Sequence, residues 1–481
     1  MAHNKFLPRV LAAAAAMMLL AGCGSKADPG FSPANPVNIT IWTYYNGEQL
    51  EAFNALVDEF NSTVGKEQGI TVESSSHGSV TDLENNVLAS AEGKVGAEAM
   101  PNIFSAYADT AYALDEMGQI ADLSDYLSEE DRAAFIEDYL SEGDFSGSGS
   151  IKIFPVAKSA ELLFLNETDW EPFAAATGAT YDDLATIEGL VSVAERYYEW
   201  TDAQTPDIPN DGRAFFGRDA MANYMLIGAK QLGCTIFAAQ GGSMTLNFDH
   251  DAVRTLWDNY YVPFIKGYFS ASGRFRSDDV KTGNIIAYVG SSSSATFFPT
   301  QVIADDMDSH DITRKALESP KFANGEDYAV QQGAGMVVTK ASDAEIQASL
   351  VFLKWFTSPE HNITFSVDSG YLPVTHEGNS IDAIRISGLA LSDEMDEVLS
   401  AAVDTVNENH LYTPHAFSGG TNARAILEYS MSDKASADRA AVKEAMAQGQ
   451  SLEEASAQFL SDECFEAWYQ DTLASLEAFQ G

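Results

Sequence analysis

At the start of the globular part of the chain, the spacing of hydrophobic residues changes from every second position to every third or fourth position and back. Residues 37–42 alternate apolar and polar side chains, which predicts a strand that ends at Trp42. From Gly47 to about Val64 the apolar residues recur every three or four positions, which predicts an amphipathic helix. Alternation returns over 70–72 and predicts a second strand. A strand–helix–strand unit implies a right-handed crossover between parallel strands, so the fold is expected to be α/β.

The apolar pattern beyond this unit continues to mix strands and helices. Strands are expected at 103–104, 162–165, 284–288 and 336–338, with helices over 80–92, 183–200, 219–232 and 346–356, the last stopping near Pro359. Two segments rich in Gly and Ser are predicted to be a turn (144–150) and a loop (290–294). From about residue 392 the pattern is mostly helical.

The N-terminal residues have the layout of a bacterial lipoprotein signal. Two basic residues precede an apolar run over 10–20, which is shorter than the roughly 20 residues needed to cross a bilayer. Two small residues then lead to Cys23. We expect residues 1–22 to be removed, Cys23 to be lipidated, and residues 23–36, rich in Gly, Ser and Pro, to form a flexible tether. An ordinary secreted protein with a cysteine here by chance is the alternative.

Composition narrows the classes of partner. The 481-residue chain has 71 acidic and 27 basic residues, for a net charge of -44. Such a charge repels nucleic acid and anionic lipid surfaces, so neither is an expected partner. The length predicts more than one hydrophobic core. Once Cys23 is lipidated, Cys234 and Cys464 remain, and an oxidising compartment would allow a bridge between them that their spacing does not decide.

Several segments, taken in order, resemble the family 1 extracellular solute-binding proteins, the receptors of ABC importers that include the maltose- and glycerol-3-phosphate-binding proteins. After the strand at Trp42 and its helix come MPNIF (100–104), FPVAKSAELLFLN (154–166), QGAGMVVTK (332–340), FLKWFTSPE (352–360) and SGYLPVT (369–375). Each segment alone is weakly specific. Their order behind a lipoprotein signal supports the resemblance over the whole mature chain.

The resemblance implies an α/β, two-lobed periplasmic-binding-protein-like fold of type II with three hinge crossings. The crossings are expected near 154–158, 287–291 and 356–360. Lobe 1 would then comprise 37–156 plus 291–357, and lobe 2 would comprise 157–290 plus 358–481. Ligand would bind between the lobes, and hinge closure would bury it.

The resemblance also implies a function without chemistry on the ligand. The chain would be a monomeric, lipid-anchored receptor outside the cytoplasm, without a cofactor and not an enzyme. It would capture a carbohydrate or a phosphorylated polyol, such as glycerol 3-phosphate, and deliver it to the transmembrane subunits of an ABC permease.

Aromatic residues after the predicted strands are the first candidates for ligand contacts. Sugars need aromatic faces and fixed polar groups, and ligands of α/β sheets bind outside the carboxyl ends of strands. Tyr44 and Tyr45 follow the first strand, and one of them is expected to line the cleft. Tyr107 and Asp109 follow the strand at 103–104, and the same argument applies to them.

Further candidates come from the resemblance, and they are Asn46, Lys158, Ser159, Ser292, Ser293, Tyr371 and Arg424. Arg424 resembles the arginine that the glycerol-phosphate branch places near its phosphate, where a guanidinium can bind two oxygens at once. Lys158 in the same cleft would add positive charge. Asn46 and Val80 replace a glutamate and a tyrosine of that branch, so the contacts to the polyol would differ.

Two other classes of protein stay open, an extracellular carbohydrate-active enzyme and a surface adhesin. In so acidic a chain a pair of carboxylates says little about glycosidase chemistry. No nucleophile elbow, phosphate-binding loop or HExxH motif occurs. His410 and His415 fit no common metal spacing, and the aspartates between 305 and 311 lack the glycine and closing glutamate of an EF-hand, so no metal site is expected.

Overall fold

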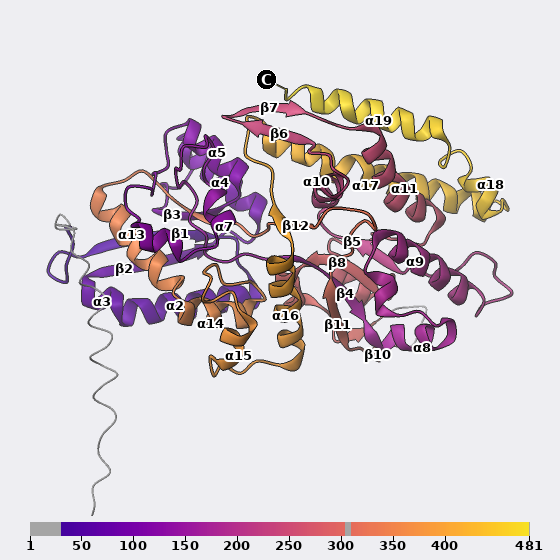
Figure 1. The fold of residues 1–481 in the computed structure, drawn as a ribbon, viewed down its shortest axis with the longest axis horizontal. Helices are drawn as coiled ribbons and strands as arrows, with labels where there is room; N and C mark the ends of the chain where they lie inside the picture. The colour runs from indigo at the N-terminus through magenta and orange to yellow at the C-terminus, as the bar shows by residue number, and fades with distance from the viewer. Residues whose placement is uncertain (1–29, 304–308, 481) are drawn as a thin grey trace, which may run out of the picture.

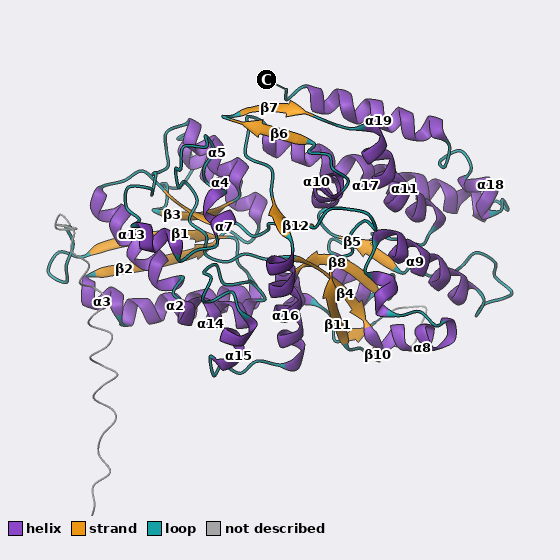
Figure 2. Cartoon of the chain, viewed as in Figure 1, coloured by secondary structure: helices purple, strands orange, loops and turns teal. Residues whose placement is uncertain are grey.

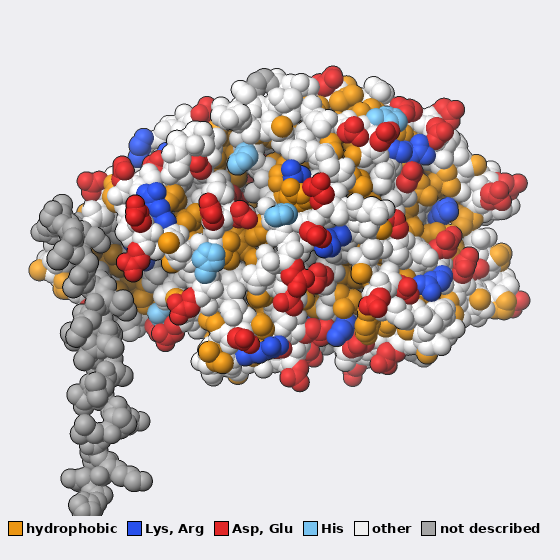
Figure 3. Space-filling view, viewed as in Figure 1, with side chains coloured by type: hydrophobic (Ala, Val, Ile, Leu, Met, Phe, Trp, Pro, Cys, Tyr) orange, Lys and Arg blue, Asp and Glu red, His pale blue; other side chains and the backbone are white. Residues whose placement is uncertain are grey.

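The computed structural model describes residues 30–303 and 309–480, which form two α/β lobes lying side by side (Figure 1). The predicted signal peptide, Cys23, the start of the tether and Asp305, Asp306 and Asp308 lie outside the described residues. Among the described residues, we find no helix that combines the length and the apolar character of a membrane span. Acidic side chains are spread over both lobes on the face drawn in Figure 3.

The first lobe is built on a four-stranded sheet in the order β13-β3-β1-β2. Strand β1 (Val37–Thr43) pairs in parallel with β2 (Ile70–Ser76) and with β3 (Ile103–Ala106), as the strand–helix–strand pattern predicts. Strand β13 (Gly335–Val338) joins the edge antiparallel to β3, although it lies more than 200 residues later in the chain. The predicted parallel crossover is therefore confirmed.

Helices cover both faces of this sheet (Figure 2). Strand residues Ile39 and Ile41 pack on one face with α2 (Gly47–Ser62) and α13 (Asp343–Phe356), and α14 (Pro359–Ser369) packs against α2. On the other face Trp42 packs with α4 (Val80–Ala91) and α5 (Ala108–Glu116). Three short helices, α3 (Val64–Gln68), α6 (Glu129–Ala133) and α7 (Glu137–Ser141), complete the lobe.

The second lobe is built on another four-stranded sheet, in the order β11-β4-β8-β5. Strand β4 (Glu161–Asn166) is fully buried and antiparallel to both β8 (Ala287–Ser291) and β11 (Arg314–Glu318). Strand β5 (Phe216–Arg218) pairs in parallel with β8. Because β4 is buried on both faces, its sequence is a continuous apolar run rather than an alternating one.

The two faces of the second sheet have different covers. One face packs against a large core built with α8 (Glu167–Thr177), α9 (Ile187–Asp202), α10 (Met221–Gln231), α11 (His250–Lys266), α17 (Gly420–Ala447) and α19 (Asp462–Glu477). The other face packs against α16 (Asp393–Glu408), in the same core that fills one side of the first lobe. This shared core makes the lobes continuous.

The smaller elements connect these layers. They are η1 (Tyr181–Leu184), β6 (Phe237–Gln240), β7 (Ser243–Leu246), α12 (Arg276–Lys281), η2 (Ser292–Phe297), β9 (Gln301–Val302), β10 (His310–Asp311), β12 (Tyr328–Val330), α15 (Ile381–Ile386), β14 (His410–Tyr412) and α18 (Leu452–Ser456). Strands β12 and β14 pair in parallel, and β6 and β7 form a hairpin.

The strand pairing shows that two of the three connections between the lobes lie at other positions in the chain than expected. The first lies near its expected place, between Phe154, which pairs with Met336 of the first sheet, and β4. The second lies between β11 and β13 rather than at 287–291, because that segment is β8 in the middle of the second sheet. The third lies between α14 and α16 rather than at 356–360. The segment 291–318 therefore belongs to the second lobe, because β11 pairs with β4.

Three local expectations also need correction. Phe31 is buried in the core of the first lobe and Ser32 pairs with Asn35, so the end of the expected tether packs on the protein body. The strand expected at 284–288 begins at Ala287, and the expected loop 290–294 is divided between β8 and the 3-10 helix η2. The helix predicted to stop near Pro359 does so, since α13 ends at Phe356, and Pro359 begins the next helix, α14, where the N–H that proline lacks would have no helical partner.

Cysteines and potential metal ligands are dispersed in the part of the chain that the structure describes. Cys234 and Cys464 are both free thiols, so the bridge left open by the sequence is not formed. Within residues 30–303 and 309–480, no three His, Cys, Asp or Glu side chains gather closely enough to hold a metal ion.

Candidate ligand site between the lobes

The carboxyl ends of the parallel strands in the two sheets approach each other where the lobes meet. Strand β1 leads into Tyr44, and β3 leads into Tyr107. In the second lobe β5 leads into Asp219, and β4 begins directly after the first crossing. We call this region the lobe junction. It is the position at which open α/β sheets bind ligands.

Three tyrosines meet at the lobe junction. The hydroxyl oxygens of Tyr44 and Tyr371 are 3.3 Å apart, and the ring of Tyr371 stacks on Phe365 with 5.9 Å between centroids. Tyr107 lies close enough for Tyr371 to raise its pKa further, although burial is the main cause of the rise. Tyr44 and Tyr107 are half-buried. Neutral phenols in such a group can both donate and accept hydrogen bonds.

The second lobe contributes one cation that lacks a carboxylate partner. Arg424 on α17 donates to Oδ1 of Asn223 and makes no ion pair within the described parts of the chain. Its charge lowers the pKa of Tyr107 and of Asp109, against the larger effect of burial, so it lies near both. Arg424 therefore lies near the lobe junction, and its contact with a ligand stays a prediction.

Asp109 brings the two lobes into direct contact. A Cβ built at Gly420, the first residue of α17, would lie only 2.3 Å from Oδ1 of Asp109. The carboxylate thus lies at the positive end of a helix from the opposite lobe. Burial raises the pKa of Asp109 to about 6, with the charge of Arg424 opposing the shift and Glu84 and Glu142 adding to it.

Lys158 is not the free ligand-binding cation that the sequence suggested. Its side chain is fully buried in the first crossing, where its amine contacts the Glu142 carboxylate and donates to the carbonyl of Gly333 at 2.8 Å. The ion pair cancels the charge of Lys158. The lobe junction therefore lacks the cluster of two available cations that a phosphate ligand would favour.

Other sequence candidates have structural roles. Tyr45 is 1% exposed and packs among Phe53, Phe365 and Tyr371, so Tyr44 is the one of the pair that faces the junction. Ser292 is buried and donates to the carbonyl of Gly370 at 2.9 Å. The hydroxyl of Ser293 pairs with that of Ser291 at 2.9 Å. The hydroxyl of Ser292 therefore ties η2 to the start of the third crossing, whereas that of Ser293 makes a local contact between β8 and η2.

Two of the predicted ligand-binding residues have a polar side-chain group with only a long hydrogen bond or none in the described chain. Asn46 is exposed at the start of α2, where it makes no capping hydrogen bond and only a long contact to the carbonyl of Gly78. Ser159 is buried, and its hydroxyl has no hydrogen-bond partner among the described residues. Because an unpaired buried hydroxyl is costly, Ser159 is a reasonable place for a ligand hydrogen bond.

The second-lobe side of the junction holds a polar frame that the sequence pattern did not single out. Glu161 at the start of β4 contacts the Arg218 guanidinium and accepts from Nδ2 of Asn223 at 2.8 Å. Ala220 follows Asp219 with φ of +50°, a conformation that costs energy for a residue with a side chain and is concentrated at functional sites. The only sequence signal for this frame is its position after an apolar strand.

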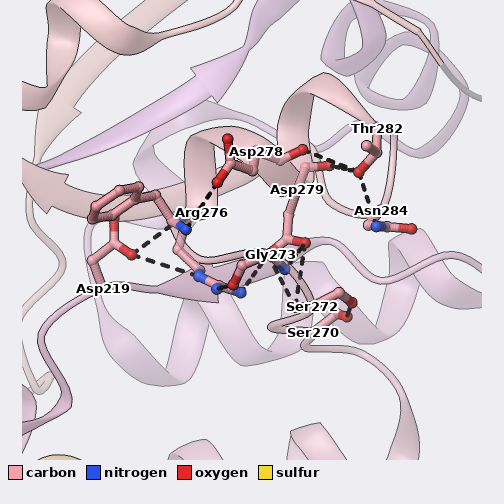
Figure 4. Close-up of polar contacts among 10 residues, drawn as sticks. Asp219, Ser270, Ser272, Gly273, Arg276, Asp278, Asp279, Thr282 and Asn284 are labelled. Carbon is pink, nitrogen blue, oxygen red and sulfur yellow. Dashed lines mark hydrogen bonds and ion pairs between the residues drawn. The ribbon is translucent and has the colours of Figure 1, made fainter.

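A second buried network anchors Asp219 (Figure 4). The guanidinium of Arg276 lies 3.6 Å from Oδ1 of Asp219 and also contacts the carboxylate of Asp279. Asp219 in turn accepts from the backbone N–H of Arg276 at 3.2 Å. Burial raises the pKa of Asp219 to about 6, against the opposing charge of Arg276. The network fixes the edge of the second lobe that faces the junction.

The raised pKa values of Asp109 and Asp219 predict a pH-dependent stability. Between pH values of about 4 and 6 the folded chain holds protons that the unfolded chain has released, because both folded pKa values are about 6. Their contribution to stability should therefore decrease as pH rises, by at most about 1.4 kcal/mol per pH unit for each group. The Asp109→Asn and Asp219→Asn double variant lacks both groups. Its free energy of unfolding in urea should therefore fall less, or rise more, with pH in this window than that of the native protein. An unchanged slope would contradict the assignment.

Comparison with known proteins places this geometry in a family. Residues 55–384 match the profile of the family described as "Bacterial extracellular solute-binding protein". None of the curated protein sequences compared with the chain matches it. Solved structures do match, and they include the cyclic α-maltosyl-1,6-maltose binding protein of Arthrobacter globiformis, with 17% identity and a TM-score of 0.66, covering 92% of this chain and 100% of that one.

Two further structures are similar over nearly their full lengths. UgpB from Mycobacterium tuberculosis, in complex with glycerophosphocholine, has 16% identity and a TM-score of 0.65, with 92% of this chain and 98% of that chain covered. An ABC substrate-binding protein from Listeria monocytogenes, in complex with cycloalternan, has 15% identity and a TM-score of 0.63, with 92% and 99% covered. The TM-scores and coverages show that these proteins share the fold of this chain. The profile match over more than half of the chain shows that this protein belongs to the bacterial extracellular solute-binding protein family.

Proposed function

We propose that this protein is the receptor of an ABC importer and that it captures an uncharged carbohydrate at the lobe junction. The observation that carries the proposal is the group of three tyrosines at the lobe junction: Tyr44 and Tyr107 follow the first-lobe strands β1 and β3, and Tyr371 follows α14. Aromatic faces bind the C–H surface of a sugar, and phenol groups bind its hydroxyls. Two of the similar structures carry carbohydrate names or ligands, which supports the same class.

Charge favours an uncharged ligand over a phosphorylated polyol. Lys158, Arg218 and Arg276 each already contact a carboxylate. Arg424 remains as a single cation close to Asp109. A phosphate dianion would meet more carboxylates than available cations, and the repulsion would be strong in this half-buried region.

A phosphorylated polyol is the second candidate ligand, and Arg424 is the residue that favours it. Its guanidinium has no carboxylate partner within residues 30–303 and 309–480, and a phosphate could occupy that role. The similarity to UgpB, whose structure contains glycerophosphocholine, supports this candidate. A phosphate ligand would need the charge of Arg424, whereas an uncharged carbohydrate would not. Substitution of Arg424 therefore distinguishes the two classes.

Capture would work by closure at the three crossings. A ligand that contacts both lobes stabilises the closed form by the difference between its affinities for the closed and open forms. Asp109 and Gly420 already bring the lobes together at one point. In this proposal the permease recognises the closed form, and the protein does no chemistry on its ligand.

Substitutions at the lobe junction test the ligand class. We expect a thermal-shift panel of sugars, sugar phosphates and glycerol phosphates to identify a carbohydrate. Tyr44→Ala should then weaken its binding about tenfold or more, because one aromatic contact is lost. Arg424→Ala should change the affinity by less than about threefold. The measurement is isothermal titration calorimetry, and Tyr429→Ala is the matched control, since Tyr429 is exposed on α17. Loss of binding in Arg424→Ala alone would overturn the carbohydrate assignment in favour of a phosphate.

We also propose that the receptor is held on the outer face of the membrane through a lipid on Cys23. The apolar run before Cys23 and the small residues that lead to it support this location. A lipid tether would raise the concentration of the receptor near its permease without a new protein contact. Mass spectrometry of the mature N-terminal peptide should show an acylated Cys23, and an intact or differently cleaved N-terminus would contradict the proposal.

A further inference from the structure

A cavity lies in the second lobe, away from the lobe junction. Its volume is about 770 Å³, within the range of small-molecule sites. It is lined by residues next to the amino ends of β5 and β8, such as Ala214 and Ile286, whereas the lobe junction lies at the carboxyl ends of these strands. The cavity therefore lies at the opposite edge of the sheet and is separate from the proposed carbohydrate site.

Two cations of α17 line this cavity without a carboxylate partner in the described chain. Arg439 is 9% exposed and donates to the carbonyl of Ile265 at 2.8 Å, with its guanidinium against Gly267 at the end of α11. Lys443 lies one turn further along α17, at the exposed rim. The loss of solvation and the charge of Arg439 lower the pKa of Lys443. Like charges four residues apart repel each other unless an anion lies between them.

Part of the cavity wall is aromatic and held in place by packing. Trp200 is half-buried, and its ring packs 5.6 Å from the centroid of Phe173, which fixes its position in the cavity wall. The loop that carries Ser270 and Ser272 forms part of the rim, and the Asp279 carboxylate accepts from the backbone N–H of Ser272 and of Gly273 (Figure 4). A preformed wall loses little entropy when a ligand binds.

We infer that this cavity binds a small organic anion whose charged group contacts Arg439 and Lys443 and whose apolar body packs on Trp200. In a chain with a net charge of -44, two neighbouring cations without a carboxylate partner in the described chain are unusual. Two carboxylates also line the cavity, but Asp169 pairs with His310 and Asp211 accepts from the hydroxyl of Thr205. An anionic group would offset the repulsion between the two cations, and a guanidinium can bind a carboxylate through two hydrogen bonds. An aromatic wall beside the cations suits a ligand with a ring or hydrocarbon portion.

Fluorine NMR with 4-fluorobenzoate tests this inference. We expect saturable binding to the mature protein and, for the neutral isostere 4-fluorobenzyl alcohol, at least about tenfold weaker binding, because its hydroxymethyl group lacks the charge. Since Arg439 also caps α11, its truncation would mix folding with binding, and the decisive variants are Lys443→Gln and Trp200→Leu. Each should weaken 4-fluorobenzoate binding about fivefold or more.

A matched control on the same helix separates local contact from net charge. Lys434→Gln removes one positive charge from α17, but Lys434 pairs with Asp438 and does not line the cavity. It should leave 4-fluorobenzoate binding unchanged, while all variants keep the native melting temperature within a few degrees. Equal binding of the acid and the alcohol, no binding of the acid, or equal losses in Lys434→Gln and Lys443→Gln would each overturn the inference.

Discussion

Replacing Lys158 by methionine should lower the free energy of unfolding by about 3–5 kcal/mol, because the substitution leaves the Glu142 carboxylate buried without its partner. The side chains of Lys158 and Glu142 are 0% and 4% exposed, so water cannot replace the lost amine. Lys158 also donates to the carbonyl of Gly333, which belongs to the second crossing. This hydrogen bond ties the first crossing to the second, so the loss of the Lys158 amine should also loosen the hinge.

Chemical denaturation followed by circular dichroism measures this effect. Lys94→Met is the control, since Lys94 forms an exposed pair with Glu92 and its side chain is 63% exposed. That substitution should change the free energy of unfolding by less than about 1 kcal/mol. The Lys158→Met and Glu142→Leu double variant should regain most of the loss, because no unpaired charge then remains. A loss below about 1 kcal/mol in Lys158→Met would contradict the stabilising role of the buried ion pair.

Replacing Gly420 by alanine should hold the lobes apart while leaving the chain folded. A Cβ at this position would lie 2.3 Å from Oδ1 of Asp109, closer than packed atoms can approach. The backbone of Gly420 does not need a positive φ, and alanine favours a helix more than glycine does, so the substitution should not disturb α17 itself. Overpacking of this kind costs about 1–3 kcal/mol, which would weaken ligand binding by about tenfold to a hundredfold if closure is required.

Small-angle scattering and calorimetry together test the second prediction. The Gly420→Ala protein should have a larger radius of gyration than the native protein and weaker binding of the solute found by thermal shift. The double variant Asp109→Ala and Gly420→Ala removes the atom that clashes, so it should return the radius to the native value. If Gly420→Ala has the native radius and the native affinity, the contact between Asp109 and α17 does not control closure.

The lobe junction shows where sequence-based prediction succeeds and where it stops. Tyr44 and Tyr107 could be named in advance because each directly follows an apolar strand, and the carboxyl ends of parallel strands meet at one edge of a sheet. Tyr45 could not be distinguished from Tyr44, because successive residues after a strand can turn to either side. Only its packing against Phe53 and Phe365 placed it in the core.

Charged residues were harder to assign than aromatic ones. Lys158 appeared in a motif that suggested a ligand contact, but its partner Glu142 lies in a different part of the chain with no pattern that links the two. Glu161, Arg218 and Asn223 come from separate elements and meet through hydrogen bonds that sequence spacing does not encode. The charge available to a ligand therefore depends on pairings that exist only in the folded chain.

The amino-acid sequence by itself determined many of the helices and strands, the α/β class and the family, because local hydrophobic period and ordered motifs depend on neighbours along the chain. It also determined which tyrosines follow the first-lobe strands. The tertiary structure decided which strands share a sheet, as when β11 pairs with β4 and moves 291–318 into the second lobe. It likewise decided which cations are neutralised, since pairing and burial depend on residues that are distant in sequence and adjacent in space.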